Sequence, residues 1–321
     1  MPPNYREFDL TRLRLLPLAE RVHDLDLSVL RELAPCAPRP QLAEAGAAIA
    51  RARADKASVI FMMGAHVIRS GLQRYLIDLM RRGVITCLSL NGACVIHDFE
   101  LAMIGKTTES VARYIARGQF GLWRETGRIN DIVARGARQG QGLGECVGAY
   151  VAGSDFPHKD ISLLAAAWEL GVPATVHVGI GADIIHEHPN CDGAAFGAAS
   201  HRDFLRFAAE LDHVDHGFVA NFGSAVTAPE VFLKALAMVR NGRFHEGRSM
   251  AGFTTLVTDL VPLPGNPQDH APEKSDARYY FRPWKTMLVR CVADGRGMYV
   301  QGRHEETIPE LWTAVRDAGQ G

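Results

Sequence analysis

Hydrophobic and polar positions follow two different rhythms along this chain. Short, continuous apolar runs are separated by longer segments in which apolar residues recur at helical spacing, as Leu72, Leu76 and Leu79 do. The short runs predict buried strands, and the longer segments predict amphipathic helices. The predicted strands cover residues 59–63, 84–90, 174–180, 216–222 and 253–260. The predicted helices cover residues 70–82, 97–104, 109–116, 162–170, 199–211, 228–242 and 308–315.

Strands that alternate with helices predict a parallel sheet with helices on both faces. We therefore expect an α/β protein with a Rossmann-like, doubly wound parallel sheet over residues 51–321. Residues 1–50 are expected to form an N-terminal helical extension, which the prolines of "APCAPRP" interrupt. Right-handed crossovers place the carboxyl ends of all the strands at one edge, where such folds bind their ligands. The polar, proline-rich residues 262–282 predict either a linker or a loop that closes over a site.

The composition is typical of a soluble globular protein. Of 321 residues, 47% are hydrophobic and 22% are charged, and the formal net charge is −1. Without a basic run, neither nucleic acid nor an anionic membrane is an expected partner. The N-terminus carries many charges and no continuous apolar segment, which argues against a signal peptide or a membrane span. The six cysteines are scattered without a CxxC pair, so we expect a reducing, cytoplasmic environment.

Glycine-containing turns follow four of the predicted strands. Glycine lets backbone N–H groups approach a ligand closely, and the N-terminus of the next helix favours an anion. Together these turns would form the floor of a site for a phosphate-bearing cofactor, although each turn alone is also explained as a structural connection. The chain contains neither GxGxxG nor GxxxxGK[ST]. The turns are Gly64, Asn91-Gly92-Ala93, Gly179-Ile180-Gly181 and Gly223-Ser224-Ala225.

Two carboxylates and two histidines lie near these turns. Asp98 and Asp183 could accept hydrogen bonds from ribose hydroxyls, and Asp98 is equally explained as a negative charge at a helix N-terminus. His186 and His188 are candidates for moving protons at the edge of a site. With Cys191 they could also ligate zinc, but one loop rarely completes a metal site, and we expect no metal.

Two long segments resemble the deoxyhypusine synthase family. The first, "GAHVIRSGLQRYLIDLMRRGVITCLSLNGACVIHDFEL", resembles the first nucleotide-binding half of that family. The second runs from "GADIIHEHPNCDG" to "HGFVANFGSAVTAPEVFLKALAMVRNG". It resembles the family's Gly-Asp-hydrophobic stretch, a helix, a strand that ends in glycines, and a further helix. The two segments span residues 55–260 in the family's order.

The resemblance implies a homotetramer with NAD at its subunit interfaces and a small-molecule amine as substrate. In that family NAD oxidises a polyamine to an imine, and the alkylamine group then passes to an acceptor. Asp183 falls where the family holds the polyamine with a carboxylate. With Gly64 of the first turn, the residues expected to lie along NAD are His66, Ser70, Gly71, Asn91, Gly92, Ala93, Asp98, Gly223 and Ser224.

The catalytic loop of that family resembles Ser275-Asp276-Ala277-Arg278 followed by Trp284-Lys285. The resemblance implies that Lys285 is the nucleophile that carries the imine, with Asp276 and Trp284 beside the substrate. Residues 262–282 would then be a lid. The alternative is that Lys285 is a solvated residue of a flexible loop.

Two departures from the family concern the amine site. The family's Lys-His-His is replaced by Ala228-Pro229-Glu230, and an acidic residue before the tryptophan is replaced within "YYF". Glu230 would then join Asp183 in holding a cationic substrate, while His186 or His188 moves protons. The NAD site is therefore better supported than the polyamine site.

Three other functions stay open on the sequence. One is an NAD-dependent oxidoreductase or isomerase that acts on another small molecule. The second is a non-catalytic nucleotide-binding protein, and the third is a zinc hydrolase. Cys94 is a further candidate nucleophile, because a thiol beside a helix N-terminus has a lowered pKa.

Overall fold

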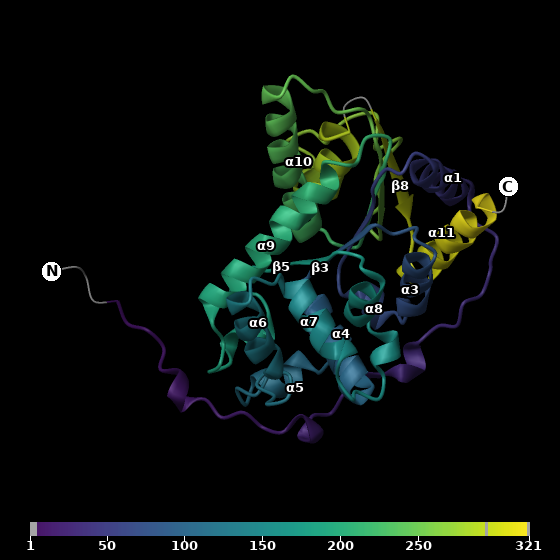
Figure 1. Cartoon of the computed structure of the whole chain (residues 1–321). Coiled ribbons are helices and arrows are strands. Elements are labelled where there is room, and N and C mark those ends of the chain that lie inside the picture. The colour runs from purple at the N-terminus through teal and green to yellow at the C-terminus, as the bar shows by residue number, and fades with distance from the viewer. Residues whose placement is uncertain (1–4, 293–294, 320–321) are drawn as a thin grey trace.

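A computed structural model describes residues 5–292 and 295–319, and its centre is a six-stranded parallel sheet (Figure 1). The strands lie in the order β5-β3-β2-β6-β7-β8. Numbered along the chain within this sheet, the order is 3-2-1-4-5-6, which is that of a Rossmann fold. The predicted α/β class with a doubly wound parallel sheet is confirmed. The strands are β2 (Val59–Met63), β3 (Cys87–Asn91), β5 (Ala174–His177), β6 (Phe218–Phe222), β7 (Thr254–Asp259) and β8 (Arg296–Gln301).

Helices cover both faces of the sheet, and Figure 1 shows α10 and α1 on opposite sides of the strands. None of the helices in the described part of the chain is long and apolar enough to cross a membrane. The α-helices are α1 (Pro40–Ala54), α2 (His66–Arg69), α3 (Gln73–Arg81), α4 (Gly92–Ile104), α5 (Val111–Ile115), α6 (Arg128–Arg138), α7 (Leu143–Ala152), α8 (Leu163–Leu170), α9 (Gly193–Leu211), α10 (Thr227–His245) and α11 (His304–Ala318).

The core consists of two hydrophobic clusters, one on each face of the sheet. Residues of β2 alternate between them: Phe61 packs in the cluster with α1, α3, α4 and α11, whereas Ile60 and Met62 pack in the cluster with α10. Because both faces are buried, the strand is apolar throughout, as the sequence predicted from its continuous hydrophobic run. A π-helix, Trp284–Arg290, belongs to the second cluster and lies in the connection from β7 to β8.

Three α-helices, α2, α6 and α7, and one strand of the main sheet, β8, were absent from the sequence prediction. In α7, Gly144 and Gly148 bring the helix against the carbonyl oxygens of Ala174 and Leu164, where a Cβ would overlap. These glycines allow close packing but lower the helix propensity of the segment, which hides the helix from a pattern-based prediction. The missed strand β8 is an edge strand, and its residues do not alternate regularly between exposed and buried, which leaves no period-2 pattern in the sequence.

The N-terminal segment, residues 5–39, was expected to be helical but contains no α-helix. It contains only 3-10 turns and the two-residue strand β1 (Leu25–Asp26), which pairs with β4 (Lys106–Thr107). The first α-helix begins at Pro40, a position that a helix tolerates because its first N–H needs no partner. Figure 1 shows this segment running along the outside of the molecule past α5 and α4.

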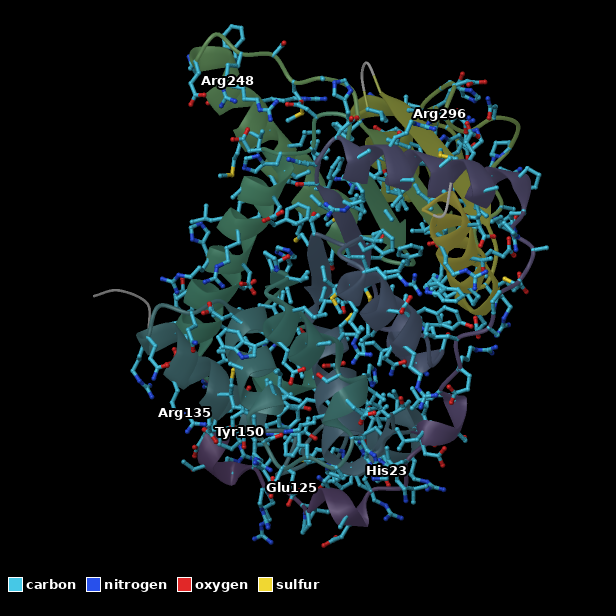
Figure 2. The ribbon with its side chains drawn as sticks, turned by 45° about the vertical axis from the view of Figure 1, so that its right-hand side comes forward. His23, Glu125, Arg135, Tyr150, Arg248 and Arg296 are labelled. Carbon is cyan, nitrogen blue, oxygen red and sulfur yellow. The ribbon has the colours of Figure 1, made fainter. Side chains whose placement is uncertain are left out.

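Polar contacts attach the N-terminal segment to the domain. Figure 2 shows His23 and Glu125 on the side along which the segment runs, and Glu125 accepts a hydrogen bond from the N–H of Leu18 at 2.6 Å. Farther along, the N–H of Arg31 donates to the carbonyl of Gly71 at 2.9 Å. The segment therefore covers part of the edge at which β2 and β3 end.

Candidate active site at the carboxyl edge of the sheet

The four glycine turns lie side by side at one edge of the sheet. They follow β5, β3, β2 and β6, which are consecutive neighbours in the strand order. The strands also end level, because Met63 pairs with Leu90 and Phe222, and Asn91 pairs with His177. The predicted convergence of the turns is confirmed. It places the switch point of the fold, where the strand order reverses, between β2 and β6.

Gly64 and Gly223 meet at this switch point. A Cβ on Gly64 would lie 3.1 Å from the carbonyl oxygen of Gly223. Gly223 has a φ of 67°, and a Cβ there would overlap the imidazole of His304 at the start of α11. A Cβ on Gly64 would force the neighbouring backbone to shift by a few tenths of an ångström. Gly223 has no side chain, and the imidazole of His304 takes the space beside it.

Asp183 lies beside the next turn, at the N-terminus of α4. Its carboxylate occupies the position that a Cβ on Gly92 would take. Burial raises the pKa of Asp183 to about 6, and no neighbouring charge or hydrogen bond contributes to this shift. Asn91, one residue earlier, caps α4 by accepting a hydrogen bond from the N–H of Cys94 at 3.1 Å.

A cavity of about 230 Å³ opens next to Asp183, between α4 and the N-terminal segment. Arg21 of that segment forms a doubly hydrogen-bonded ion pair with Glu100 at 2.9 and 2.6 Å, with both side chains buried. Glu109 accepts hydrogen bonds from the N–H of Gly121 at 3.0 Å and from Nε1 of Trp123 at 2.8 Å. The remaining walls are mostly apolar and include Ala93, Ile96, Phe120 and Ile184.

His97 also lines the cavity, and burial lowers its pKa to about 4. Its imidazole is therefore neutral at pH 7, and its Nδ1 lies 2.8 Å from Oγ1 of Thr107. It contributes a dipole and no charge to the cavity. His97 was not among the site residues predicted from the sequence.

Several buried polar atoms at this edge have no hydrogen-bond partner within the described residues. Leaving such an atom unpaired costs about 1–3 kcal/mol, so a cluster of them indicates a surface suited to a polar ligand. Oγ1 of Thr258, the second-last residue of β7, and Nδ1 of His304, the first residue of α11, extend the cluster past the switch point. The atoms are Nε of Arg69, Oγ1 of Thr108, Nε2 of His186, Oγ1 of Thr258 and Nδ1 of His304.

His186 is oriented by the turn that holds Asp183. Its Nδ1 accepts hydrogen bonds from the N–H groups of Gly181 and Asp183, both at 3.2 Å. In a neutral ring the proton then lies on Nε2, the atom without a partner. Burial lowers the pKa of His186. Its position agrees with a role at the edge of the site, and that role stays a prediction.

Asp98 and His188 have structural positions, which corrects their proposed roles. Asp98 is buried and accepts hydrogen bonds from Oγ of Ser162 at 2.5 Å and from the N–H of Leu163 at 2.8 Å. Its carboxylate thus serves the N-terminus of α8 and does not face a ribose. His188 is buried, and its Nε2 donates to the carbonyl of Gly121 at 2.7 Å. This hydrogen bond places His188 in the packing of the loop.

Other predicted cofactor residues have local contacts of their own. Gly71 has a φ of 72° and lies against the carbonyl of Val29, so the N-terminal segment covers it. Ser224 is buried and caps α10, because its Oγ accepts from the N–H of Ala228 at 3.0 Å. Ser70 ends α2 and is partly buried. His66 is exposed at the edge, and its Nε2 lies 3.4 Å from Nη1 of Arg69.

The residues predicted in the catalytic loop lie away from Asp183. Glu230 forms ion pairs with Lys234 and Arg282 and is not open to a cationic substrate, which corrects that prediction. Trp284 is buried, and its Nε1 donates to the carbonyl of Pro267 at 2.7 Å, so it holds the crossover together. Asp276 pairs with Arg278 at 2.8 Å.

Lys285 is buried rather than solvated. It lies in the π-helix, with its Nζ 3.6 Å from the ring centroid of Tyr279. The residues that line the cavity beside Asp183 do not include it. Within one chain, the structure therefore does not bring the predicted nucleophile and the predicted amine-binding carboxylate together.

The structure supports neither the cysteine nucleophile nor the zinc site. Cys94 is buried, and burial raises its pKa to about 12, which corrects the expectation of a lowered thiol pKa. Within residues 5–292 and 295–319, no three His, Cys, Asp or Glu side chains gather as a metal site. Cys191 is partly buried and packs against the hydrophobic core.

Arg69 and His304 at this edge were also missed in the sequence. Arg69 lies inside the first quoted segment, in α2 directly after β2, where it reads as an ordinary polar residue. His304 belongs to "GRHEETIP", a stretch that indicates only the start of a helix. His304 reaches the site through the strand order, which brings β8 and α11 to the edge shared with β2. No local pattern could have indicated this.

No protein-family model matches the chain, and no curated protein matches it. A solved ternary complex of AgrE with ornithine and NAD+ is 13% identical, covers 90% of this chain and has a TM-score of 0.49. A LOR/SDH protein from Methanococcus maripaludis S2 is 12% identical, with 90% of this chain covered, 73% of that chain covered and a TM-score of 0.49. A protein described as a deoxyhypusine synthase from Entamoeba histolytica is 7% identical, with 91% and 85% covered and a TM-score of 0.44.

The chain spans about a third of the length of the AgrE structure, of which it covers 34%, and of the arginine dihydrolase ArgZ from cyanobacteria, of which it covers 32%. All of these TM-scores are below 0.5. The assignment of the fold therefore depends on the strand order of the sheet itself.

Proposed function

We propose that this protein is an NAD-dependent enzyme that oxidises the amine-bearing carbon of a small molecule to an imine. The observation that carries the proposal is the side-chain-free corner of Gly64 and Gly223 at the switch point, with the carboxylate of Asp183 at a neighbouring turn. Open α/β sheets bind dinucleotides at such a point. A carboxylate without a cationic partner suits an ammonium group.

The residues at the switch point fit a dinucleotide. Gly64 and Gly223 leave the backbone of the two turns without side chains, and the imidazole of His304 lies where a Cβ on Gly223 would point. A pyrophosphate would bind to the backbone N–H groups of this corner. Oγ1 of Thr258 and Nδ1 of His304 supply polar atoms without partners in the described chain. When bound, NAD would accept a hydride from the carbon next to the amine.

The side chains of this protein would hold the amine and remove its proton. Asp183 would bind the substrate ammonium through charge-assisted hydrogen bonds. The carboxylate of Asp183, whose pKa burial raises to about 6, would take the proton that leaves the nitrogen as the carbon loses its hydride. Nε2–H of His186, beside the same turn, would donate a hydrogen bond, because Nδ1 already accepts from the backbone. The products would be the imine, the reduced cofactor and the proton on Asp183.

A second candidate is transfer of the resulting alkylamine to an acceptor through Lys285. The observation that favours it is the burial of Lys285 in a π-helix, a form that is frequent at functional sites. A lysine held in a desolvated position can form an imine with a carbonyl or an iminium carbon. Within one chain, Nζ of Lys285 would have to move away from the ring of Tyr279 to form that imine. The homotetramer implied by the sequence resemblance stays a prediction.

Calorimetric titration with NAD, followed by assays of NADH absorbance with putrescine, spermidine and amino acids, tests the proposal. We expect NAD to bind and at least one amine to be oxidised, with a loss of rate of at least tenfold in Asp183→Asn. Glu246→Gln at the exposed end of α10 is the matched control and should keep the full rate.

The same assay separates the two candidates. Stoichiometric NADH and an unchanged rate in Lys285→Ala support the oxidoreductase. Release of a shortened amine without net NADH, lost in Lys285→Ala, supports the transferase. If NAD does not bind, both are wrong.

A further inference from the structure

The charged groups around the cavity beside Asp183 divide into two sets. The first set is already engaged within the protein: Arg21 pairs with Glu100 at 2.6 Å and lies 4.0 Å from Glu109. Two threonine hydroxyls, those of Thr107 and Thr126, also donate to Glu100, each at 2.6 Å. Glu109 has two N–H donors of its own. These groups have hydrogen-bond partners within the protein, and together they carry one net negative charge.

The second set consists of Arg69 and Asp183, which have opposite charges and line the same cavity. Nε of Arg69 is buried and has no hydrogen-bond partner in the described chain. The guanidinium has one polar side-chain contact, from Nη1 to the neutral acceptor Nε2 of His66. Asp183 forms none of the ion pairs found within the described residues, and burial is the only cause of its raised pKa.

We infer that this cavity binds an α-amino acid, with its carboxylate on Arg69 and an ammonium on Asp183. The inference rests on the proposed function for the choice of an amine, and it adds the substrate class. A guanidinium presents a planar fork of N–H donors that matches a carboxylate. A polyamine would instead place a second cation against Arg69, and the like charges would repel each other in a desolvated site.

The balance of charge favours a basic amino acid. Arg21, Glu100 and Glu109 together carry one more negative than positive charge, whereas Arg69 and Asp183 cancel. A ligand with two ammonium groups and one carboxylate would neutralise the cavity. Its volume of about 230 Å³ lies below the roughly 300–1,000 Å³ of pockets for drug-sized ligands, so the site suits a single small metabolite.

Calorimetric titration without NAD tests this inference with matched pairs of ligands. L-ornithine, L-lysine and L-arginine are compared with putrescine, cadaverine and agmatine, which lack only the carboxylate. We expect at least one amino acid to bind at least tenfold more tightly than its decarboxylated counterpart. In Arg69→Gln that advantage should disappear, while binding of the diamine is unchanged or stronger. In Asp183→Asn both ligands should lose at least tenfold.

Arg81→Gln is the matched control, because Arg81 is an exposed arginine on the neighbouring helix α3. It should leave the preference intact. The inference is overturned if the diamines bind as tightly as the amino acids, if Arg69→Gln keeps the preference, or if none of the three amino acids binds. These outcomes are independent of NAD titration, so failure of the substrate class and failure of the proposed redox function can be told apart.

Discussion

Three aspartates in the described part of the chain have a raised pKa, and their surroundings separate a structural role from a binding role. Burial raises the pKa of Asp98 to about 6 and that of Asp203 to about 7, although both accept backbone hydrogen bonds. Asp203 receives the N–H groups of Gly144 and Val176, each at 2.9 Å. Asp183 has the same raised pKa, but no donor compensates for its burial. An uncompensated carboxylate of this kind indicates a ligand-binding residue.

Asp183→Asn should therefore stabilise the protein at pH 7.5. The folded pKa of about 6 lies above the ordinary value of 3.8, so ionisation costs stability as the pH rises from about 4 to 6 and the cost is constant above pH 6. Because Asp183 is partly exposed, we expect a gain of about 1–2 kcal/mol at pH 7.5 and about a third of that gain at pH 4.5. Urea denaturation at the two pH values measures this difference.

Asp98→Asn is the control for this prediction. The amide nitrogen would face a backbone N–H at the start of α8, so this variant should lose about 1–3 kcal/mol at pH 7.5. A loss of stability in Asp183→Asn of similar size would mean that Asp183 has a structural role, against the proposal.

At the scale of elements, the N-terminal segment closes the cavity and helps define the site. Arg21 is inserted between Glu100 and the ring of Trp123, whose centroid lies 5.9 Å away. A buried pair of this type costs about 3–5 kcal/mol when one partner is removed, so it holds the segment firmly in place. Farther along, Val29 packs over Gly71 at the end of the first glycine turn.

Gly71→Ala should detach this part of the segment. The substitution adds strain at a φ of 72° and a Cβ that overlaps the carbonyl oxygen of Val29. We expect a loss of about 2–4 kcal/mol and faster tryptic cleavage at Arg31. Gly140→Ala is the matched control, since its φ of 77° carries similar strain but its Cβ would meet open space. Equal effects of the two variants would show that the contact with Val29 contributes nothing.

Comparison of the predicted and observed elements shows which of them the sequence could predict. The strand at 59–63 and the helix at 162–170 were predicted nearly to the residue, because an apolar run and a capping Ser162 are local signals. The N-terminal segment was expected to be helical, but it is extended, and Leu25, Leu27 and Leu30 pack against the first core cluster. Its conformation depends on contacts such as that between Arg21 and Glu100, which are 79 residues apart and have no signature in sequence.

At the scale of the whole molecule, the strand order decides which of the predicted site residues can meet. Gly64 and Gly223 are far apart in sequence and adjacent at the switch point. The glycine turns could be predicted because each follows its own strand, whereas the entry of His304 depends on β8 adding to the far side of β7. Figure 2 shows Arg296, at the start of β8, close to α1, and its ion pair with Glu44 attaches this edge strand to the domain. The strand order therefore brings residues from the N-terminal half of the chain, such as Gly64, and from its C-terminal end, such as His304, to the same edge of the sheet.

Gly64→Ala tests whether the switch point is the dinucleotide site. Gly64 does not have a positive φ, and its new Cβ would lie 3.1 Å from the carbonyl oxygen of Gly223, so the neighbouring backbone must shift by a few tenths of an ångström. We expect a stability cost of only about 1 kcal/mol but a loss of at least tenfold in NAD affinity by calorimetry, because the shift moves the backbone N–H groups of the corner that the pyrophosphate would contact. Gly179→Ala is the control at the same edge, since its Cβ would make an ordinary contact at 3.9 Å with Ala182. If Gly179→Ala weakens NAD binding and Gly64→Ala does not, the cofactor lies over β5 instead of the corner between β2 and β6.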